Sequence, residues 1–187
     1  MAFTSCAESE SYIPKPRIYP KVNYPEKSFV EYKNNECPFE MSIPSYMVYL
    51  EDSLKNNKES SFNCWFDLYS KDLNAYIHFS YVGFNKRSKF DELVEDAFEM
   101  ADKHNVKASY RDEIRISYPD KKVYGLLFDI DGPVASPVQF FLTDSTSHFL
   151  RGSLYFKGEV NRDSILPVYN FVRSDLPPMF DSFNWIN

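Results

Sequence analysis

Residues 122–156 contain three apolar runs that follow one another with only short turns between them. The runs cover residues 123–130, 137–143 and 148–156, and the turns between them are rich in Gly and Pro or in Asp, Ser and Thr. Runs of this length, bounded by turn residues, predict β-strands. Connections this short leave no room for a crossover helix, so neighbouring strands should run antiparallel. The stretch therefore predicts a central antiparallel sheet.

The remaining elements follow from the spacing of apolar residues. Short runs at 46–51, 63–69, 73–82 and 112–117 predict further strands. A second helix is expected from about residue 163 until Pro177 and Pro178 end it. This order of elements predicts an α+β fold, an α/β sandwich around the antiparallel sheet. The clearer, first helix is predicted at 89–104, where six apolar residues recur at helical spacing: Phe90, Leu93, Val94, Ala97, Phe98 and Ala101.

The first 44 residues differ in composition from the rest of the chain. Half of the 12 prolines lie between residues 14 and 44, which prevents a long helix and favours extended segments. We therefore expect residues 1–44 to form a lipobox-like start and an extended, proline-rich leader. Residues 45–187 should form a single α/β sandwich domain.

The charge and hydropathy of the chain exclude two classes of protein. The formal net charge is −6, whereas binding to nucleic acid phosphates requires a concentrated basic face. Nucleic acid is therefore not an expected partner. No apolar run reaches the length of about 18 residues that a transmembrane helix needs, so none is predicted.

Residues 126–134, LLFDIDGPV, resemble the nucleophile segment of the haloacid dehalogenase superfamily of phosphatases. In that superfamily a strand presents one aspartate as nucleophile and another, two residues later, as acid/base; here these would be Asp129 and Asp131. The chemistry uses Mg²⁺, and the strand leads into a helix. Pro133 stands where a threonine is usual, and the residues that follow predict a hairpin. We therefore interpret the segment as a strand that ends in an Asp-Gly-Pro turn.

Neither the histidines nor the polar segment 144–148 indicates a catalytic or metal site. The sequence DSTSH at 144–148 contains an acid, hydroxyls and a histidine, but a catalytic triad converges from different elements of the fold. We interpret the segment as a tight turn. His78, His104 and His148 show no paired spacing with each other or with cysteines. We therefore expect no metal site and no cofactor.

The three cysteines have different expected roles. Cys6 follows Phe3-Thr4-Ser5, and small residues before a cysteine are typical of a lipoprotein processing site. The apolar h-region of such a site is not found in residues 1–5, so we expect lipidation of Cys6 in a precursor that carries one. Cys37 and Cys64 then remain, either as a disulfide in an oxidising compartment or as two buried thiols.

Several segments spread over the chain share one resemblance. They are FTSC (3–6), YIPKPR (12–17), ECPF (36–39), CWF (64–66), AYIHFSY (75–81), LVEDA (93–97) and the whole block 122–156. Together they resemble the gliding-motility lipoprotein GldD family. The resemblance implies a lipid-anchored protein of the cell envelope of gliding bacteria that faces the periplasm and is required for gliding and type IX protein secretion. No catalytic residues are assigned to that family. At the level of the fold, the predicted sandwich resembles the PsbP-like group of non-catalytic accessory proteins.

The resemblance and the composition together favour a non-enzymatic protein that contacts other gliding and secretion proteins. Aromatic residues make up 18% of the chain, and exposed aromatic area usually marks contact surfaces. Two alternatives remain open: a phosphohydrolase that uses Asp129 and Asp131, and a module that binds a small ligand or glycan through exposed aromatics. For the five residues of the expected contact surface, burial in the core is the alternative: Tyr69, Tyr76, Phe180, Phe183 and Trp185.

Overall fold

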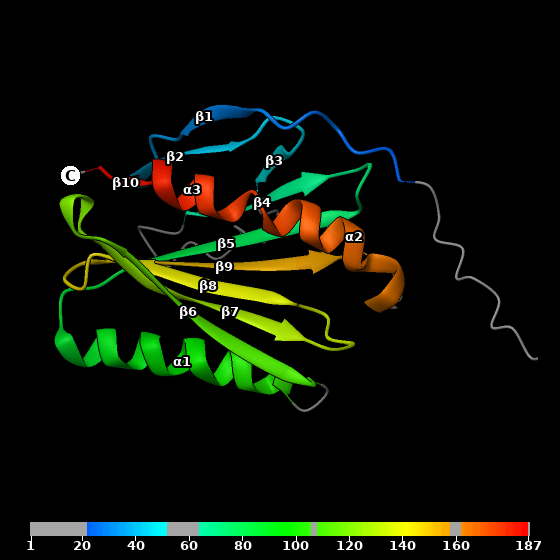
Figure 1. The fold of residues 1–187 in the computed structure, drawn as a ribbon. Coiled ribbons are helices and arrows are strands. Elements are labelled where there is room, and N and C mark those ends of the chain that lie inside the picture. The colour runs from blue at the N-terminus through cyan, green and yellow to red at the C-terminus, as the bar shows by residue number, and fades with distance from the viewer. Residues whose placement is uncertain (1–21, 52–63, 106–107, 158–161, 187) are drawn as a thin grey trace, which may run out of the picture.

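The computed structural model describes residues 22–51, 64–105, 108–157 and 162–186. Its main feature is a seven-stranded antiparallel sheet with the strand order β3-β4-β5-β9-β8-β7-β6 (Figure 1). The strands are β3 (Val48–Glu51), β4 (Trp65–Ser70), β5 (Ala75–Gly83), β6 (Tyr110–Tyr118), β7 (Val123–Asp131), β8 (Val138–Thr143) and β9 (His148–Phe156). A single-turn 3₁₀ helix, η1 (Pro119–Lys121), connects β6 to β7. The predicted α+β fold with a central antiparallel sheet is confirmed.

The burial pattern of the strands explains how the sheet is layered. Residues of β5 alternate between buried and half-buried, as expected for a strand with only one face in a core. In β8, which lies next to the central strand β9, all six residues are buried. The middle of the sheet is therefore covered on both faces.

One face of the sheet is covered by α1 (Arg87–Asn105), which packs on β7, β8 and β9. In Figure 1 this helix lies along the lower face of the sheet. The predicted apolar stripe faces the sheet: Ala97 and Ala101 are buried against Phe128, Phe141 and Phe149. The hydrophobic periodicity of residues 89–104 thus identified both the helix and its buried side.

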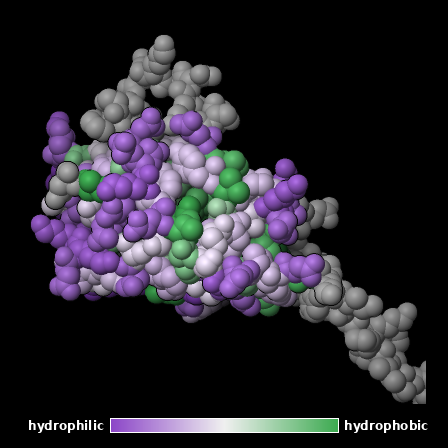
Figure 2. All heavy atoms as spheres, turned by 90° about the horizontal axis from the view of Figure 1, so that it is seen from above, coloured by the Kyte–Doolittle hydropathy of each residue, from purple (hydrophilic) through white to green (hydrophobic). Residues whose placement is uncertain are grey.

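The other face carries a larger core beneath a mixed layer of helices and strands. This layer contains α2 (Arg162–Arg173), α3 (Leu176–Ser182) and a three-stranded antiparallel sheet of β1 (Phe29–Lys33), β2 (Phe39–Pro44) and β10 (Asn184–Trp185). Figure 1 shows both helices and β1 on the side opposite to α1. Figure 2 looks down on this layer and shows hydrophobic residues gathered in a narrow band across a mostly hydrophilic surface.

The leader predicted for residues 1–44 is wrong for its last part, because residues 29–44 form the β1–β2 hairpin. Phe39 in β2 is fully buried in the larger core, so the hairpin belongs to the domain. Pro38 directly precedes β2 and Pro44 ends it. Prolines are tolerated at strand ends, where a missing N–H removes no interior ladder bond, so these two mark strand ends and not an extended tether. Residues 1–21 lie outside the described residues.

The C-terminal helix also differs from its prediction, because Pro177 and Pro178 do not end the helical region. They lie in the first turn of α3, where the missing N–H groups would have had no intrahelical partner. Ser174 and Asp175 separate α3 from α2, and Asp175 is almost fully buried. Its Oδ1 accepts a hydrogen bond from Lys27 Nζ at 2.6 Å, and its Oδ2 accepts one from the Tyr46 hydroxyl. This contact ties the start of the described chain to the C-terminal helices.

A disulfide joins the small sheet to the large one. Cys37 lies between β1 and β2, Cys64 lies directly before β4, and their Cα atoms are 5.3 Å apart. The Cys64 carbonyl oxygen also accepts a hydrogen bond from the Tyr81 N–H. The cross-link therefore fixes the β1–β2 hairpin on the sheet at the beginning of β4. None of the helices among the described residues is long and apolar enough to cross a membrane.

Candidate functional site

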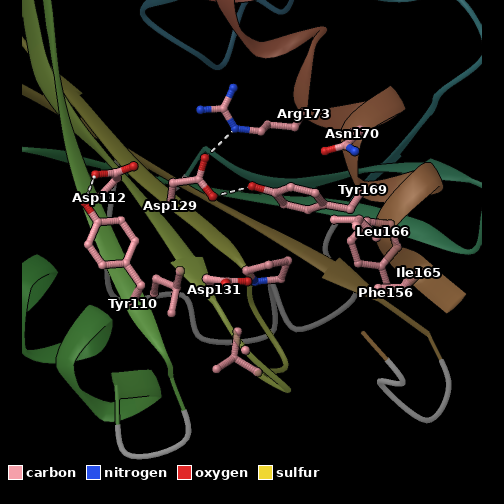
Figure 3. A pocket seen from close by; sticks show the side chains of 14 residues that line it. Tyr110, Asp112, Asp129, Asp131, Phe156, Ile165, Leu166, Tyr169, Asn170 and Arg173 are labelled. Atoms are coloured by element: carbon pink, nitrogen blue, oxygen red, sulfur yellow. Dashed lines mark hydrogen bonds and ion pairs between the residues drawn. The ribbon is translucent and has the colours of Figure 1, made fainter. Parts of the chain in front are cut away.

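A cavity of about 410 Å³ lies where the carboxyl end of β7 meets the start of β6 and one side of α2 (Figure 3). Its apolar side includes Phe156 at the end of β9 together with Ile165 and Leu166 of α2. On the opposite side in Figure 3, Tyr110 and Asp112 of β6 form the wall. Both aspartates of the phosphatase-like segment, Asp129 and Asp131, also line this cavity.

The carboxylate of Asp129 is held by α2 through both of its oxygens. Oδ1 accepts a hydrogen bond from the Tyr169 hydroxyl, and Oδ2 forms an ion pair with Arg173 Nε at 2.5 Å. Burial raises the pKa of Tyr169 well above its usual value, and the hydrogen bond to Asp129 raises it further. Burial alone would lower the pKa of Arg173, but the hydrogen bond and charge of Asp129 outweigh this and raise it. These three side chains therefore fasten α2 to the end of β7.

A second tyrosine–carboxylate contact lies at the cavity rim. The Tyr110 hydroxyl donates a hydrogen bond of 2.7 Å to Asp112 Oδ1, and this bond raises the pKa of Tyr110. The side chain of Tyr110 is 62% exposed. Nearby, the Asp131 carbonyl oxygen accepts a 2.7 Å hydrogen bond from the Ser109 N–H. The rim is therefore built from β6 and the end of β7.

The surroundings of Asp129 and Asp131 differ from those of the phosphatase nucleophile. β7 pairs antiparallel with both β6 and β8, whereas the phosphatase segment belongs to a doubly wound sheet. Gly132, with φ of 139°, begins a turn that leads to β8 and not to a helix. Among the described residues, no group of three or more His, Cys, Asp or Glu side chains is arranged to hold a metal ion.

Residues 144–148 form the predicted turn. Asp144 Oδ1 accepts hydrogen bonds of 2.9 Å from the backbone N–H groups of Thr146, Ser147 and His148. Burial would raise the pKa of Asp144, but these N–H groups and the Thr146 hydroxyl lower it well below its usual range. His148 Nδ1 lies 2.7 Å from the Tyr81 hydroxyl, so this ring nitrogen contacts a tyrosine and not a serine of the segment. The structure thus supports a turn and not a triad.

The five residues of the expected contact surface do not lie together. Phe180 and Phe183 are buried in the larger core, so their assignment to a surface is wrong; apolar side chains of α3 and the segment after it complete the core. Trp185 is half-buried and stacks on His148 with ring centroids 5.0 Å apart. Tyr69 and Tyr76 are half-buried, pair across β4 and β5, and stack with centroids 4.3 Å apart.

Neighbours that the sequence analysis did not single out extend the surface around Tyr69 and Tyr76. Val48 pairs with Tyr69, and Leu50 pairs with Asp67, so both lie on the same face of the sheet as the tyrosine pair. Trp65 lies on this face as well, two and four residues before Asp67 and Tyr69 in β4. Val48, Leu50 and Trp65 are 61%, 40% and 38% exposed. We call Val48, Leu50, Trp65, Tyr69 and Tyr76 the aromatic face.

The role of α2 in the cavity was also missed. Tyr169 and Arg173 are four residues apart in a predicted helix, so a shared helical face was a usable signal for a common target. Their partner Asp129 lies 40 and 44 residues earlier in the chain, and nothing in the local pattern identifies it. Cys6 lies outside the described residues.

Comparisons with known proteins give the fold and the family. The structure is similar to the solution structure of cyanobacterial PsbP (CyanoP) from Synechocystis sp. PCC 6803, with a TM-score of 0.52 and 8% sequence identity over 86% of this chain and 94% of that chain. At this identity the similarity shows a PsbP-like fold alone. No curated protein sequence matches the chain significantly. The model of a family described as "Gliding motility lipoprotein GldD" matches residues 9–185, so the chain belongs to the family of GldD gliding motility lipoproteins.

Proposed function

We propose that this protein is a non-enzymatic component of the gliding and type IX secretion apparatus, anchored by lipid at Cys6 and acting through contacts with other proteins of that apparatus. The proposal that the protein is not an enzyme rests on one observation, the contacts made by the Asp129 carboxylate. Both oxygens of its carboxylate are engaged, one by Tyr169 and one by Arg173. A nucleophilic carboxylate needs an oxygen directed at the substrate, so this aspartate serves the fold and not a reaction.

The same observation defines a test against the phosphohydrolase alternative. Asp129→Asn keeps one oxygen acceptor for α2 but removes the carboxylate, and we expect normal gliding and secretion wherever the variant accumulates as folded protein. Asp131→Asn serves as the second variant, since Asp131 would be the acid/base of that alternative. Magnesium-dependent release of phosphate from a small phosphate ester by the wild-type chain, lost in both variants, would establish the enzyme instead.

The aromatic face supports the proposal of protein contacts. It presents three exposed apolar side chains, Val48, Leu50 and Trp65, beside the stacked pair Tyr69 and Tyr76. Tryptophan and tyrosine are enriched where proteins bind one another, because they combine a large apolar area with a polar group. Such a face also suits a sugar ring, which is why a glycan remains the second candidate ligand of this surface.

The disulfide supports a location in the periplasm. Disulfides persist in oxidising compartments and are rare in the cytosol. If the protein faces the periplasm, unreduced peptides from native material will contain Cys37 linked to Cys64. Two alkylatable thiols at these positions would contradict this location.

The lipid anchor is tested at Cys6. Cys6→Ala in the natural precursor should release the protein from the membrane fraction and abolish gliding and secretion, while the purified chain unfolds at the same temperature as wild type. Cys6 precedes the matched region 9–185 and the described residues, so an unchanged unfolding temperature would assign the defect to the anchor and not to the fold. Unchanged membrane fractionation and motility would show that the anchor lies elsewhere.

A further inference from the structure

The cavity beside α2 has an acidic lining. Among the described residues that line it are three carboxylates, Asp112, Asp129 and Asp131, and one guanidinium, Arg173. The guanidinium is already directed at Asp129 through its Nε. Asp112 is exposed at the rim, so an anion that enters there would be repelled by its carboxylate, whereas a cation would be attracted.

The rest of the lining is apolar and aromatic. Ile165 and Leu166 of α2 and Phe156 of β9 offer aliphatic and ring carbons, and Leu166 is 38% exposed. Across the cavity lies Tyr110, whose exposed ring can attract a cation through its π-face. The combination suits a group with a long apolar stem and a positively charged end. Lysine and arginine side chains have this form, and they bury their stems while the charged head stays near polar groups.

The size of the cavity agrees with such a guest. At about 410 Å³ it falls within the range of about 300–1,000 Å³ that is typical of ligand sites in proteins. It can take a long side chain together with part of the backbone that presents it. Asp112 lies at the rim beside Tyr110, and it is the carboxylate most accessible to an incoming charge.

We propose that this cavity binds a lysine or arginine side chain presented by a partner polypeptide. The apolar stem lies along Ile165 and Leu166, and the cationic head lies between Asp112 and the ring of Tyr110. This assignment rests on the proposed function through protein contacts, and it names the chemistry of one of those contacts. It gives Asp129 and Arg173 a positioning role, because they hold α2 against β7 and so keep the two walls of the cavity in place.

The proposal is tested by titrating the isotope-labelled chain with blocked tripeptides and recording backbone amide spectra. The peptides are acetyl-Gly-Lys-Gly-amide, its norleucine analogue with the same stem and no charge, and its glutamate analogue. We expect the lysine peptide to shift amides in 110–112, 129–134 and 165–173, with at least tenfold weaker binding of the norleucine peptide. Asp112→Asn should weaken the lysine peptide several-fold. Asp72→Asn, at an exposed aspartate in the β4–β5 turn, is the matched control and should change nothing.

Three outcomes would overturn the proposal. Equal binding of the lysine and norleucine peptides would show that charge plays no part. Preferential binding of the glutamate peptide, or of inorganic phosphate, would make the cavity an anion site at Arg173. Binding of butylammonium as tight as that of the lysine peptide would identify a free amine as the guest. None of these results touches the proposed lipid anchor or the need for the protein in gliding, which the Cys6→Ala variant tests separately.

Discussion

Two carboxylates in this protein are each bound by a tyrosine hydroxyl and a basic side chain, but they differ in how far water can reach them. Asp175 is bound by the Tyr46 hydroxyl and Lys27 Nζ, and Asp129 is bound by the Tyr169 hydroxyl and Arg173 Nε. The side chain of Asp175 is 2% exposed, whereas that of Asp129 is 21% exposed and lines the cavity. Chemically similar clusters thus hold the C-terminal part of α2, one around a carboxylate sealed from water and one around a carboxylate open to it.

The two clusters differ in whether a cavity that could bind a ligand lies beside the carboxylate. At Asp175, Lys27 also donates hydrogen bonds to the Phe171 carbonyl oxygen and the Ser174 hydroxyl, so the ammonium group has three acceptors around a carboxylate that is itself buried. At Asp129, only one nitrogen of the guanidinium is directed at the carboxylate, and the cavity remains beside it. We conclude that both clusters stabilise the fold, and that the second also shapes a cavity wall.

The largest expected effect is that of Lys27→Met. This change leaves the buried carboxylate of Asp175 without its ion-pair partner, and such a loss costs about 3 kcal/mol of the free energy of unfolding. The matched control is Lys33→Met, since Lys33 pairs with Glu40 at the surface, where an ion pair contributes about 0–1 kcal/mol. Urea unfolding of both variants measures the difference. Equal losses would show that burial of Asp175 does not set the strength of its ion pair.

The same substitution at the cavity should cost less. Arg173→Met leaves Asp129 with the Tyr169 hydroxyl and with access to water, so we expect a loss of about 1–2 kcal/mol. Arg115→Met, at an exposed arginine of β6, is the control for the loss of a surface guanidinium. A loss as large as that of Lys27→Met would mean that the cavity is closed to water in solution.

Much of this architecture could be predicted from the sequence, but the two clusters could not. Strand and helix positions follow from local apolar spacing, as in β5 and α1, and antiparallel pairing follows from the short turns of 122–156. The β1–β2 hairpin was missed because its prolines were interpreted as a leader, although they lie at strand ends. Lys27 and Asp175 are 148 residues apart, and no local pattern links them. Phe180 and Phe183 show that an apolar segment near a terminus can belong to the core.

The salt concentration should change the stability losses of the two variants, Arg173→Met and Lys27→Met, to different extents. The Debye length falls to about 3 Å at 1 M salt, and screening acts on charges that solvent can reach. The loss caused by Arg173→Met should therefore shrink by roughly half between 0.05 and 1 M sodium chloride, whereas that of Lys27→Met should shrink less, because its partner carboxylate is only 2% exposed. Unfolding curves at both salt concentrations test this, with each variant compared with wild type at the same salt.

The smallest expected effect concerns Asp144, a carboxylate whose partners among the described residues are backbone N–H groups and hydroxyls. Its pKa is lowered in the folded chain, so its contribution to stability is complete above the unfolded pKa of about 4 and is lost as the pH falls below it. Asp144→Asn should cost about 1 kcal/mol at pH 7, typical of a carboxylate that caps backbone donors. The gap between variant and wild type should narrow as the pH falls from 4 to 2.5, while Asp72→Asn, the exposed control, shows no such trend. A gap as wide at pH 2.5 as at pH 4 would mean that shape, and not charge, stabilises the turn. Asp144 would then differ from both Asp129 and Asp175 in the origin of its effect, and not merely in its size.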